Sequence, residues 1–223
     1  MARQHSGKTA EPVDLALVLA IDTSGSVSDE RLALQMRGYS DAFRRDELLG
    51  AIRAGRYGRI VATFVEWSDS DRQSQAVDWT VIDGPATARR FADAIMAALS
   101  PTPGWTSISG AIDYAAGLLA NLRYAAERKV IDISGDGENN DGRPVRQARD
   151  AAVAAGITIN GLPILEVEPT LDTYYREEVI GGPHAFLIVA RDRAAFAAAV
   201  RDKLLVEIAG DGPFNSAARR LRA

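Results

Sequence analysis

The residues from Leu15 to Ile21 form an uninterrupted apolar run, which restricts the possible folds more than any other feature of the sequence. A strand with one solvent-exposed face alternates apolar and polar residues, whereas a strand that is buried on both faces does not. We therefore predict a buried strand over residues 13–21, in a sheet with helices on both sides. The 223 residues, 47% of them apolar, are enough for such a core.

Strand-like and helix-like segments alternate along the rest of the chain. A helix is expected after Ser28, a good N-cap residue, because apolar residues then recur at helical spacing. Further helices are expected to begin near Pro85, Ser107, Pro144 and Asp192. Strands are expected over residues 59–67, 76–82, 130–134, 157–164 and 185–189.

The gap between strands 59–67 and 76–82 is too short for a helical crossover, so this pair is predicted to be an antiparallel hairpin at a sheet edge. The expected fold class is doubly wound α/β, with a mostly parallel sheet, one antiparallel edge strand and helices on both faces. We expect one domain over residues 13–209, between a flexible lead of residues 1–12 and a polar tail of residues 210–223.

Composition excludes several kinds of site. The chain has no cysteine, so thiolate metal sites and cysteine nucleophiles are impossible, and its two histidines, His5 and His184, cannot make a His-rich metal centre. A net charge of −4 with interspersed acids and bases predicts no nucleic-acid partner. No apolar run approaches the roughly 20 residues of a membrane span. The first 12 residues contain no signal-peptide core, which indicates a cytoplasmic protein, or a periplasmic or secreted one whose signal has been removed.

Three loops carry short oxygen-bearing side chains at junctions between the sheet and its helices. The first holds Asp22, Ser24 and Ser26, the second holds Thr106, and the third holds Asp136. Loops that follow parallel strands meet at the carboxyl edge of the sheet, where α/β proteins place ligands. Hard oxygen donors suit a hard cation, so we expect Mg²⁺ here, with Mn²⁺ or Ca²⁺ as alternatives.

The same set resembles the von Willebrand factor A (vWA) domain and its metal-ion-dependent adhesion site, whose pattern is Asp-x-Ser-x-Ser, then a Thr, then an Asp. The resemblance implies that Ser24, Ser26 and Thr106 are direct or near-direct ligands. It implies that Asp22 and Asp136 bind the metal directly or through water. Stretches such as Ile-Asp-Ile-Ser-Gly-Asp-Gly resemble a bacterial branch of uncharacterised function, whose members are often predicted to be exported.

A divalent ion held by neutral hydroxyls and two carboxylates keeps much of its positive character. A Glu or Asp of a partner can then complete its coordination. The resemblance thus implies a protein-binding module that captures an acidic side chain, and no enzyme. The sequence does not indicate the oligomeric state.

Other interpretations of these loops stay open. Each motif alone could be an ordinary cap or turn. A hydrolase would use the same three loops with His184 as its base, although no Gly-x-Ser-x-Gly elbow is present. A phosphotransferase would use Asp22, although no Lys lies in the three loops. Dinucleotide binding lacks its Gly-x-Gly-x-x-Gly motif.

Three further residues outside the predicted ligand set call for an explanation. Trp67 and Trp105 border the loops and could either contact a partner or pack beneath them. Asp132 interrupts an apolar strand, and a buried carboxylate needs a partner, for which Asn160 in the neighbouring strand is the candidate. Residues 165–184 are expected to be irregular or to contain a short helix.

Overall fold

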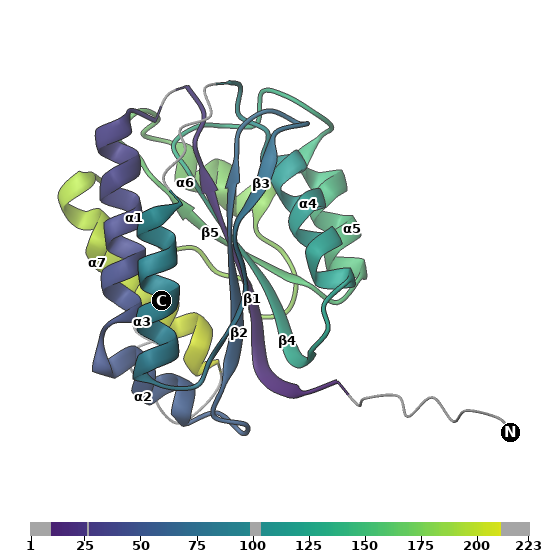
Figure 1. The fold of residues 1–223 in the computed structure, drawn as a ribbon. Coiled ribbons are helices and arrows are strands. Elements are labelled where there is room, and N and C mark those ends of the chain that lie inside the picture. Colours follow the sequence, from purple (N-terminus) through teal and green to yellow (C-terminus); the bar gives the residue numbers. More distant parts are fainter. Residues whose placement is uncertain (1–9, 26, 99–103, 211–223) are drawn as a thin grey trace, which may run out of the picture.

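The computed structural model describes residues 10–25, 27–98 and 104–210 (Figure 1). Their strands form one sheet in the order β3–β2–β1–β4–β5. β1 pairs in parallel with β2 and β4, β4 pairs in parallel with β5, and β3 is antiparallel to β2, as predicted. The bounds are β1 (Pro12–Asp22), β2 (Ile60–Trp67), β3 (Gln73–Ile82), β4 (Ala125–Gly135) and β5 (Thr158–Pro163).

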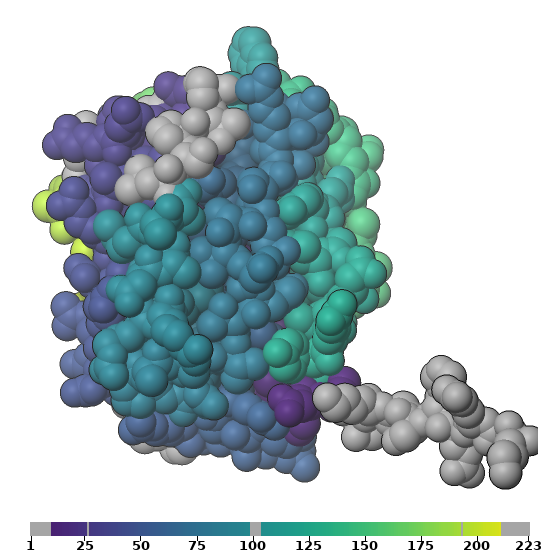
Figure 2. All heavy atoms as spheres, viewed as in Figure 1, coloured from purple at the N-terminus to yellow at the C-terminus, as the bar shows by residue number. Residues whose placement is uncertain are grey.

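Helices cover both faces of the sheet, which confirms the doubly wound class (Figure 1). One face carries α1 (Asp29–Phe43), α2 (Asp46–Arg53), α3 (Pro85–Ala97) and α7 (Arg193–Ala209). The other carries α4 (Ile108–Ala120), α5 (Val145–Ala154), α6 (Leu171–Tyr174) and the π-helix η1 (Tyr175–Val179). The edge strand β3 is partly exposed at the surface between the two helical layers (Figure 2).

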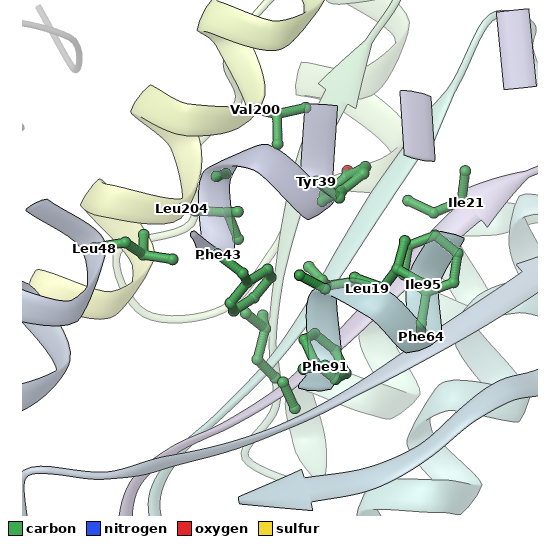
Figure 3. Packing of buried hydrophobic residues seen from close by; sticks show 14 of the residues in the cluster. Leu19, Ile21, Tyr39, Phe43, Leu48, Phe64, Phe91, Ile95, Val200 and Leu204 are labelled. Atoms are coloured by element: carbon green, nitrogen blue, oxygen red, sulfur yellow. The ribbon is translucent and has the colours of Figure 1, made fainter. Parts of the chain in front are cut away.

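Alternation along β1 divides the core into two layers. Leu15, Leu17, Leu19 and Ile21 belong to the apolar cluster beneath α1, α3 and α7, and the intervening residues belong to the cluster beneath α4 and α5. In the first cluster, Leu19 and Ile21 lie among residues from β2 and the covering helices, including Tyr39, Phe43, Phe64 and Phe91 (Figure 3). Full burial on both faces explains the unbroken apolar run.

The predicted helix starts are confirmed where capping residues mark them. Ser28, Ser107 and Asp192 each accept a backbone N–H of the first turn, which satisfies one of the donors that a helix leaves unpaired. Pro85 is the first residue of α3. The apolar spacing in the sequence also predicts Leu99 on the inner face of that helix, and Leu99 lies outside the described residues.

Two segments differ from the prediction. The helix α2 was not expected. The predicted strand 185–189 forms only an isolated parallel bridge, between Leu187 and Gly161, and the next bridge joins Ala190 to Ile164. The ladder is broken because Phe186 N–H donates to the Asn160 side chain and because Pro163 has no N–H to donate. Among the residues described, no helix has both the length and the apolar character needed to cross a membrane.

Candidate metal centre

The three predicted loops meet at one edge of the sheet, at the top of Figure 1. In the parallel register Ile21 lies beside Ser134, so that β1 and β4 end at the same level. The backbone of the first loop is tied to the second, because Gly25 N–H donates to Gly104 O at 3.1 Å. The backbone of the second loop is tied to the third, because Asn140 N–H donates to Thr106 O at 2.9 Å.

Asp22 is the most buried acid of this edge, with no exposed surface. Its Oδ1 accepts the backbone N–H of Ser24 at 2.7 Å, whereas its Oδ2 is buried and has no hydrogen-bond partner in the described structure. Burial raises the pKa of Asp22 to about 7, and the nearby Asp136 charge adds to this effect while hydrogen bonds with Ser24 oppose it. This carboxyl group therefore lacks the charge partner that a buried acid needs.

The hydroxyl groups of Ser24 and Thr106 lie against each other. Thr106 Oγ1 donates to Ser24 Oγ at 3.3 Å, and both residues are buried. The third loop also approaches this point, because a Cβ added to Gly137 would lie 3.9 Å from Thr106 Oγ1. Side-chain oxygens from two separate loops thus converge next to the third.

Asp136 is nearly buried and faces a cation from α1. Arg31 Nη1 lies 3.4 Å from Asp136 Oδ2, and Arg31 Nη2 lies 3.6 Å from Glu166 Oε1. Arg31 therefore links the third loop to the segment after β5. Sequence reasoning did not identify this residue, since an Arg in the first turn of an amphipathic helix carries no distinguishing pattern.

Tyr175 approaches the site beside Gly135. A Cβ at Gly135 would lie 3.0 Å from both Asp22 Oδ2 and the Tyr175 hydroxyl, so only glycine fits between them. That hydroxyl is buried without a hydrogen-bond partner among described residues, and burial followed by the Asp22 charge raises the pKa of Tyr175 well above its usual value. From the sequence, Tyr174-Tyr175-Arg176 are expected to form an amphipathic packing turn or a surface specific to the family. Tyr175 packs in the core, in a π-helix of the kind often found at functional sites.

Three consecutive side chains of the third loop hold the neighbouring loops in place. The Asn139 and Asn140 side-chain oxygens accept the backbone N–H groups of Ser109 (2.9 Å) and Thr106 (2.8 Å). Asp141 Oδ2 accepts Ser70 N–H at 2.7 Å. In the sequence, these residues belong to a superficial EF-hand pattern that fails because Asp141 stands where the sixth position requires Gly, and nothing marks them as residues that hold other loops. Their role depends on which backbone groups lie opposite them.

Of the predicted ligands, Asp22, Ser24, Thr106 and Asp136 are brought together, and Ser26 lies outside the described residues. No cluster of three or more His, Cys, Asp or Glu side chains suited to a metal ion occurs within the described ranges. The donor set is instead two carboxylates with hydroxyl groups. It fits a hard divalent cation, because Asp22 Oδ2 is a buried anionic oxygen that has no other partner.

The two tryptophans of the loops have opposite environments. Trp67 is fully buried at the end of β2, and Trp105, next to Thr106, is 66% exposed. The open choice between partner contact and packing is therefore resolved differently for each ring: Trp67 packs in the core, and Trp105 is free to contact a partner.

Asp132 has a different partner from the predicted one. It lies beside Asn160 in the β4–β5 register, but its carboxylate forms an ion pair with buried Lys203 of α7, with 2.6 Å between Nζ and Oδ1. Lys203 also contacts Glu207, which accepts the Asn160 amide at 3.1 Å. Asn160 is thus a member of the same buried network without being the direct partner of Asp132.

His184 lies away from the candidate site. It lines a cavity of about 260 Å³ together with Arg128 and Lys129 of β4. From Lys129 to Asp136 an extended strand covers roughly 20 Å. The structure therefore does not place His184 within reach of the hydroxyl groups of Ser24 or Thr106.

The comparison with known families covers almost the entire described region. Residues 12–212 match the family described as "Protein of unknown function (DUF1194)". The chain belongs to the DUF1194 family. A search of curated proteins found no match.

Solved structures show that this DUF1194 chain has the vWA fold. Proximal thread matrix protein 1 (PTMP1) from the mussel byssus is 15% identical, with a TM-score of 0.65 over 90% of this chain and 48% of that one. The vWF domain of the pilus tip protein Mfa5 from Porphyromonas gingivalis is 13% identical, with a TM-score of 0.60 over 87% and 95%. A von Willebrand factor type A protein from Catenulispora acidiphila is 14% identical, with a TM-score of 0.59 over 88% and 43%. The chain spans about half the length of the mussel protein, another structure of which has a zinc-occupied MIDAS motif, a metal-ion-dependent adhesion site.

Proposed function

We propose that this protein is a metal-ion-dependent protein-binding module that captures an acidic side chain of a protein partner through a divalent cation. The proposed ligands are Asp22, Ser24, Ser26, Thr106 and Asp136, and the proposed ion is Mg²⁺, with Mn²⁺ or Ca²⁺ as alternatives. The ion would supply the positive charge that draws the partner's carboxylate. The chain's own residues would hold the ion and leave part of its coordination open.

The unpartnered Oδ2 of buried Asp22 carries this proposal. Removing a carboxylate from water is costly unless a cation or hydrogen-bond donors replace the water. A divalent cation between Asp22, Asp136 and the paired hydroxyls of Ser24 and Thr106 would supply that compensation. The zinc-occupied site of the mussel vWA-fold protein supports a divalent cation at this edge of the fold.

The proposed ligands favour binding of a partner's carboxylate over catalysis. Hydroxyl ligands are neutral, so an ion held by them and two carboxylates can still attract an anionic oxygen. The histidine that the hydrolase alternative needs lies at a distant cavity. Net charge is −4, which supports a protein rather than a nucleic-acid partner. A pilus tip protein among the structural neighbours supports a periplasmic or secreted location.

Calorimetric titration of chelator-treated protein with Mg²⁺, Mn²⁺ and Ca²⁺ tests the metal site. We expect saturable binding of at least one ion, and its loss in Asp22→Ala and in Thr106→Ala. His184→Ala is the matched control and should bind the ion like the parent, since its side chain lies elsewhere. The proposal fails if the parent binds no ion, both alone and with a high concentration of acetate present to complete the coordination.

A further inference from the structure

Few large apolar side chains are strongly exposed in the described residues. The two that occur in the described ranges are Trp105, 66% exposed, and Val167, 52% exposed. Elsewhere in those ranges the large apolar residues are wholly or partly buried. Exposed apolar side chains that border a candidate binding site are available for contact with a partner.

Both side chains lie on loops that border the candidate metal centre. Trp105 immediately precedes Thr106, and its backbone N–H donates to Asp69 in the loop after β2. Val167 lies in the segment after β5, which leaves the same edge of the sheet, because Ile164 N–H donates to Gly135 O at 3.0 Å.

The neighbours of Val167 fix its position beside the third loop. Glu166 pairs with Arg31, which also contacts Asp136. Glu168 Oε2 accepts the backbone N–H of Glu138 at 3.2 Å. In the strand order β3–β2–β1–β4–β5, Trp105 is therefore on the β2 side of the centre and Val167 is on the β5 side. A segment bound at the centre would have an apolar group available on each side.

The same border carries negative charge outside the metal centre. Glu138 is exposed, and Glu168 Oε2 accepts its backbone N–H at 3.2 Å, so the two acids lie side by side at this border. Asp69 lies on the other side, beside Trp105 and in an ion pair with Arg72. A partner segment with several acids would bring its extra carboxylates close to Glu138 and Glu168, and the like charges would repel each other.

We infer that this surface selects a protein segment in which a single Glu or Asp is flanked by apolar side chains, and that it discriminates against clusters of acids. The acid would reach the metal ion, and its neighbours would cover Trp105 and Val167. This inference rests on the proposed function, since it specifies the partner of the same site. Aromatic residues at the centre of an interface commonly supply much of its binding energy.

Short blocked peptides provide the test, with ¹⁵N-labelled protein saturated with Mg²⁺ and NMR chemical shifts as the readout. The probes are acetyl-Leu-Glu-Leu-amide, acetyl-Gly-Glu-Gly-amide, acetyl-Glu-Glu-Glu-amide and acetyl-Leu-Gln-Leu-amide. We expect the Leu-Glu-Leu peptide to bind about tenfold more tightly than the Gly-Glu-Gly and triglutamate peptides, a ratio that corresponds to the loss of one strong contact. The glutamine peptide should not bind, because its neutral amide does not replace the carboxylate.

Two variants distinguish the contribution of the exposed apolar side chains to peptide binding from that of the metal ion. Trp105→Ala and Val167→Thr should bind Mg²⁺ like the parent and should lose the preference for Leu-Glu-Leu over Gly-Glu-Gly. Equal affinities for these two peptides in the Mg²⁺-loaded parent would overturn the inference and leave the metal site intact. Tighter binding of the triglutamate peptide would also overturn it. Absence of Mg²⁺ binding in the parent would overturn both the inference and the magnesium assignment beneath it.

Discussion

Asn140 shows how an uncharged residue can determine the geometry of a charged site. Its side-chain oxygen accepts Thr106 N–H and its own backbone N–H donates to Thr106 O. Both backbone polar groups of Thr106 are therefore held by Asn140. The Thr106 hydroxyl in turn contacts Ser24. Residues that orient metal ligands commonly contribute 10–100-fold to affinity without touching the ion.

We predict that Asn140→Ala weakens Mg²⁺ binding by about tenfold or more, because Thr106 loses the hydrogen bond that orients its hydroxyl. Asn140→Asp should retain most of the affinity, since an Asp oxygen can accept the same N–H. Calorimetric titration measures both. Asn139→Ala is the matched control, because Asn139 makes the same kind of bond to Ser109, outside the proposed ligand set. Equal losses in the Asn139 and Asn140 variants would show a general loosening of the loop instead.

At the scale of elements, β4 is joined to α7 by buried charges. Asp132 of β4 and Glu207 of α7 share Lys203, and all three side chains are almost fully buried. Two carboxylates and one ammonium group leave one negative charge in excess. Burial and the Glu207 charge raise the pKa of Asp132 to about 7, although Lys203 opposes both. A proton on this group therefore favours the folded state.

The raised pKa of Asp132 determines how the free energy of unfolding changes with pH. Between the ordinary carboxyl pKa of 3.8 and about 7, the folded chain holds a proton on Asp132 that the unfolded chain has released. This contribution to the free energy of unfolding is complete below pH 4 and is lost as pH rises through about 7. We predict that Asp132→Asn reduces the fall in stability between pH 4 and 7, because an amide does not titrate.

Urea unfolding across this pH range measures the effect. The free energy of unfolding of Asp132→Asn should still fall with pH, because Asp22 also titrates there, its pKa being raised to the same region. Asp150→Asn is the control, since this carboxylate is exposed in a surface ion pair with Arg149. If the free energy of unfolding falls between pH 4 and 7 as steeply in Asp132→Asn as in the parent, Asp132 keeps its charge over this range and the prediction is wrong.

At the scale of the molecule, the proposed metal centre would favour ion binding at a cost to the stability of the fold. Asp22 belongs to the same buried edge that closes the ends of β1 and β4, so its charge destabilises the fold unless a cation is bound. Ion binding should offset this cost and stabilise the whole domain, because the unfolded chain has no preformed site.

We predict that Asp22→Asn changes stability in opposite directions with and without the ion. In chelator at pH 8 the variant should melt at a higher temperature than the parent, because Asn keeps an acceptor for Ser24 N–H and carries no buried charge. With Mg²⁺ at about 100 times its Kd, the parent should gain about 2.7 kcal/mol, or roughly 5–10 °C in Tm. The variant should gain almost nothing. Scanning calorimetry measures all four conditions, and a parent melting temperature that does not respond to any divalent ion would contradict the prediction.

The sequence by itself determined most of the elements of this protein and the candidate ligands, but it indicated neither α2 nor the irregular form of residues 185–189. Apolar periodicity and capping are local properties, so the run from Leu15 to Ile21, the cap at Ser28 and the antiparallel edge strand could be predicted correctly. Asp22 and Asp136 could be assigned to one edge, because parallel strands place their carboxyl ends together.

Only the tertiary structure decided which groups face each other across separate segments. Lys203 reaches Asp132 because α7 packs on β4, and Asn140 holds Thr106 because two loops meet; neither pairing follows from spacing along the chain. The opposite exposures of Trp67 and Trp105 have the same origin. Local patterns determine which elements form and where they begin. The packing of distant elements determines whether a given side chain meets water, a charge or another side chain.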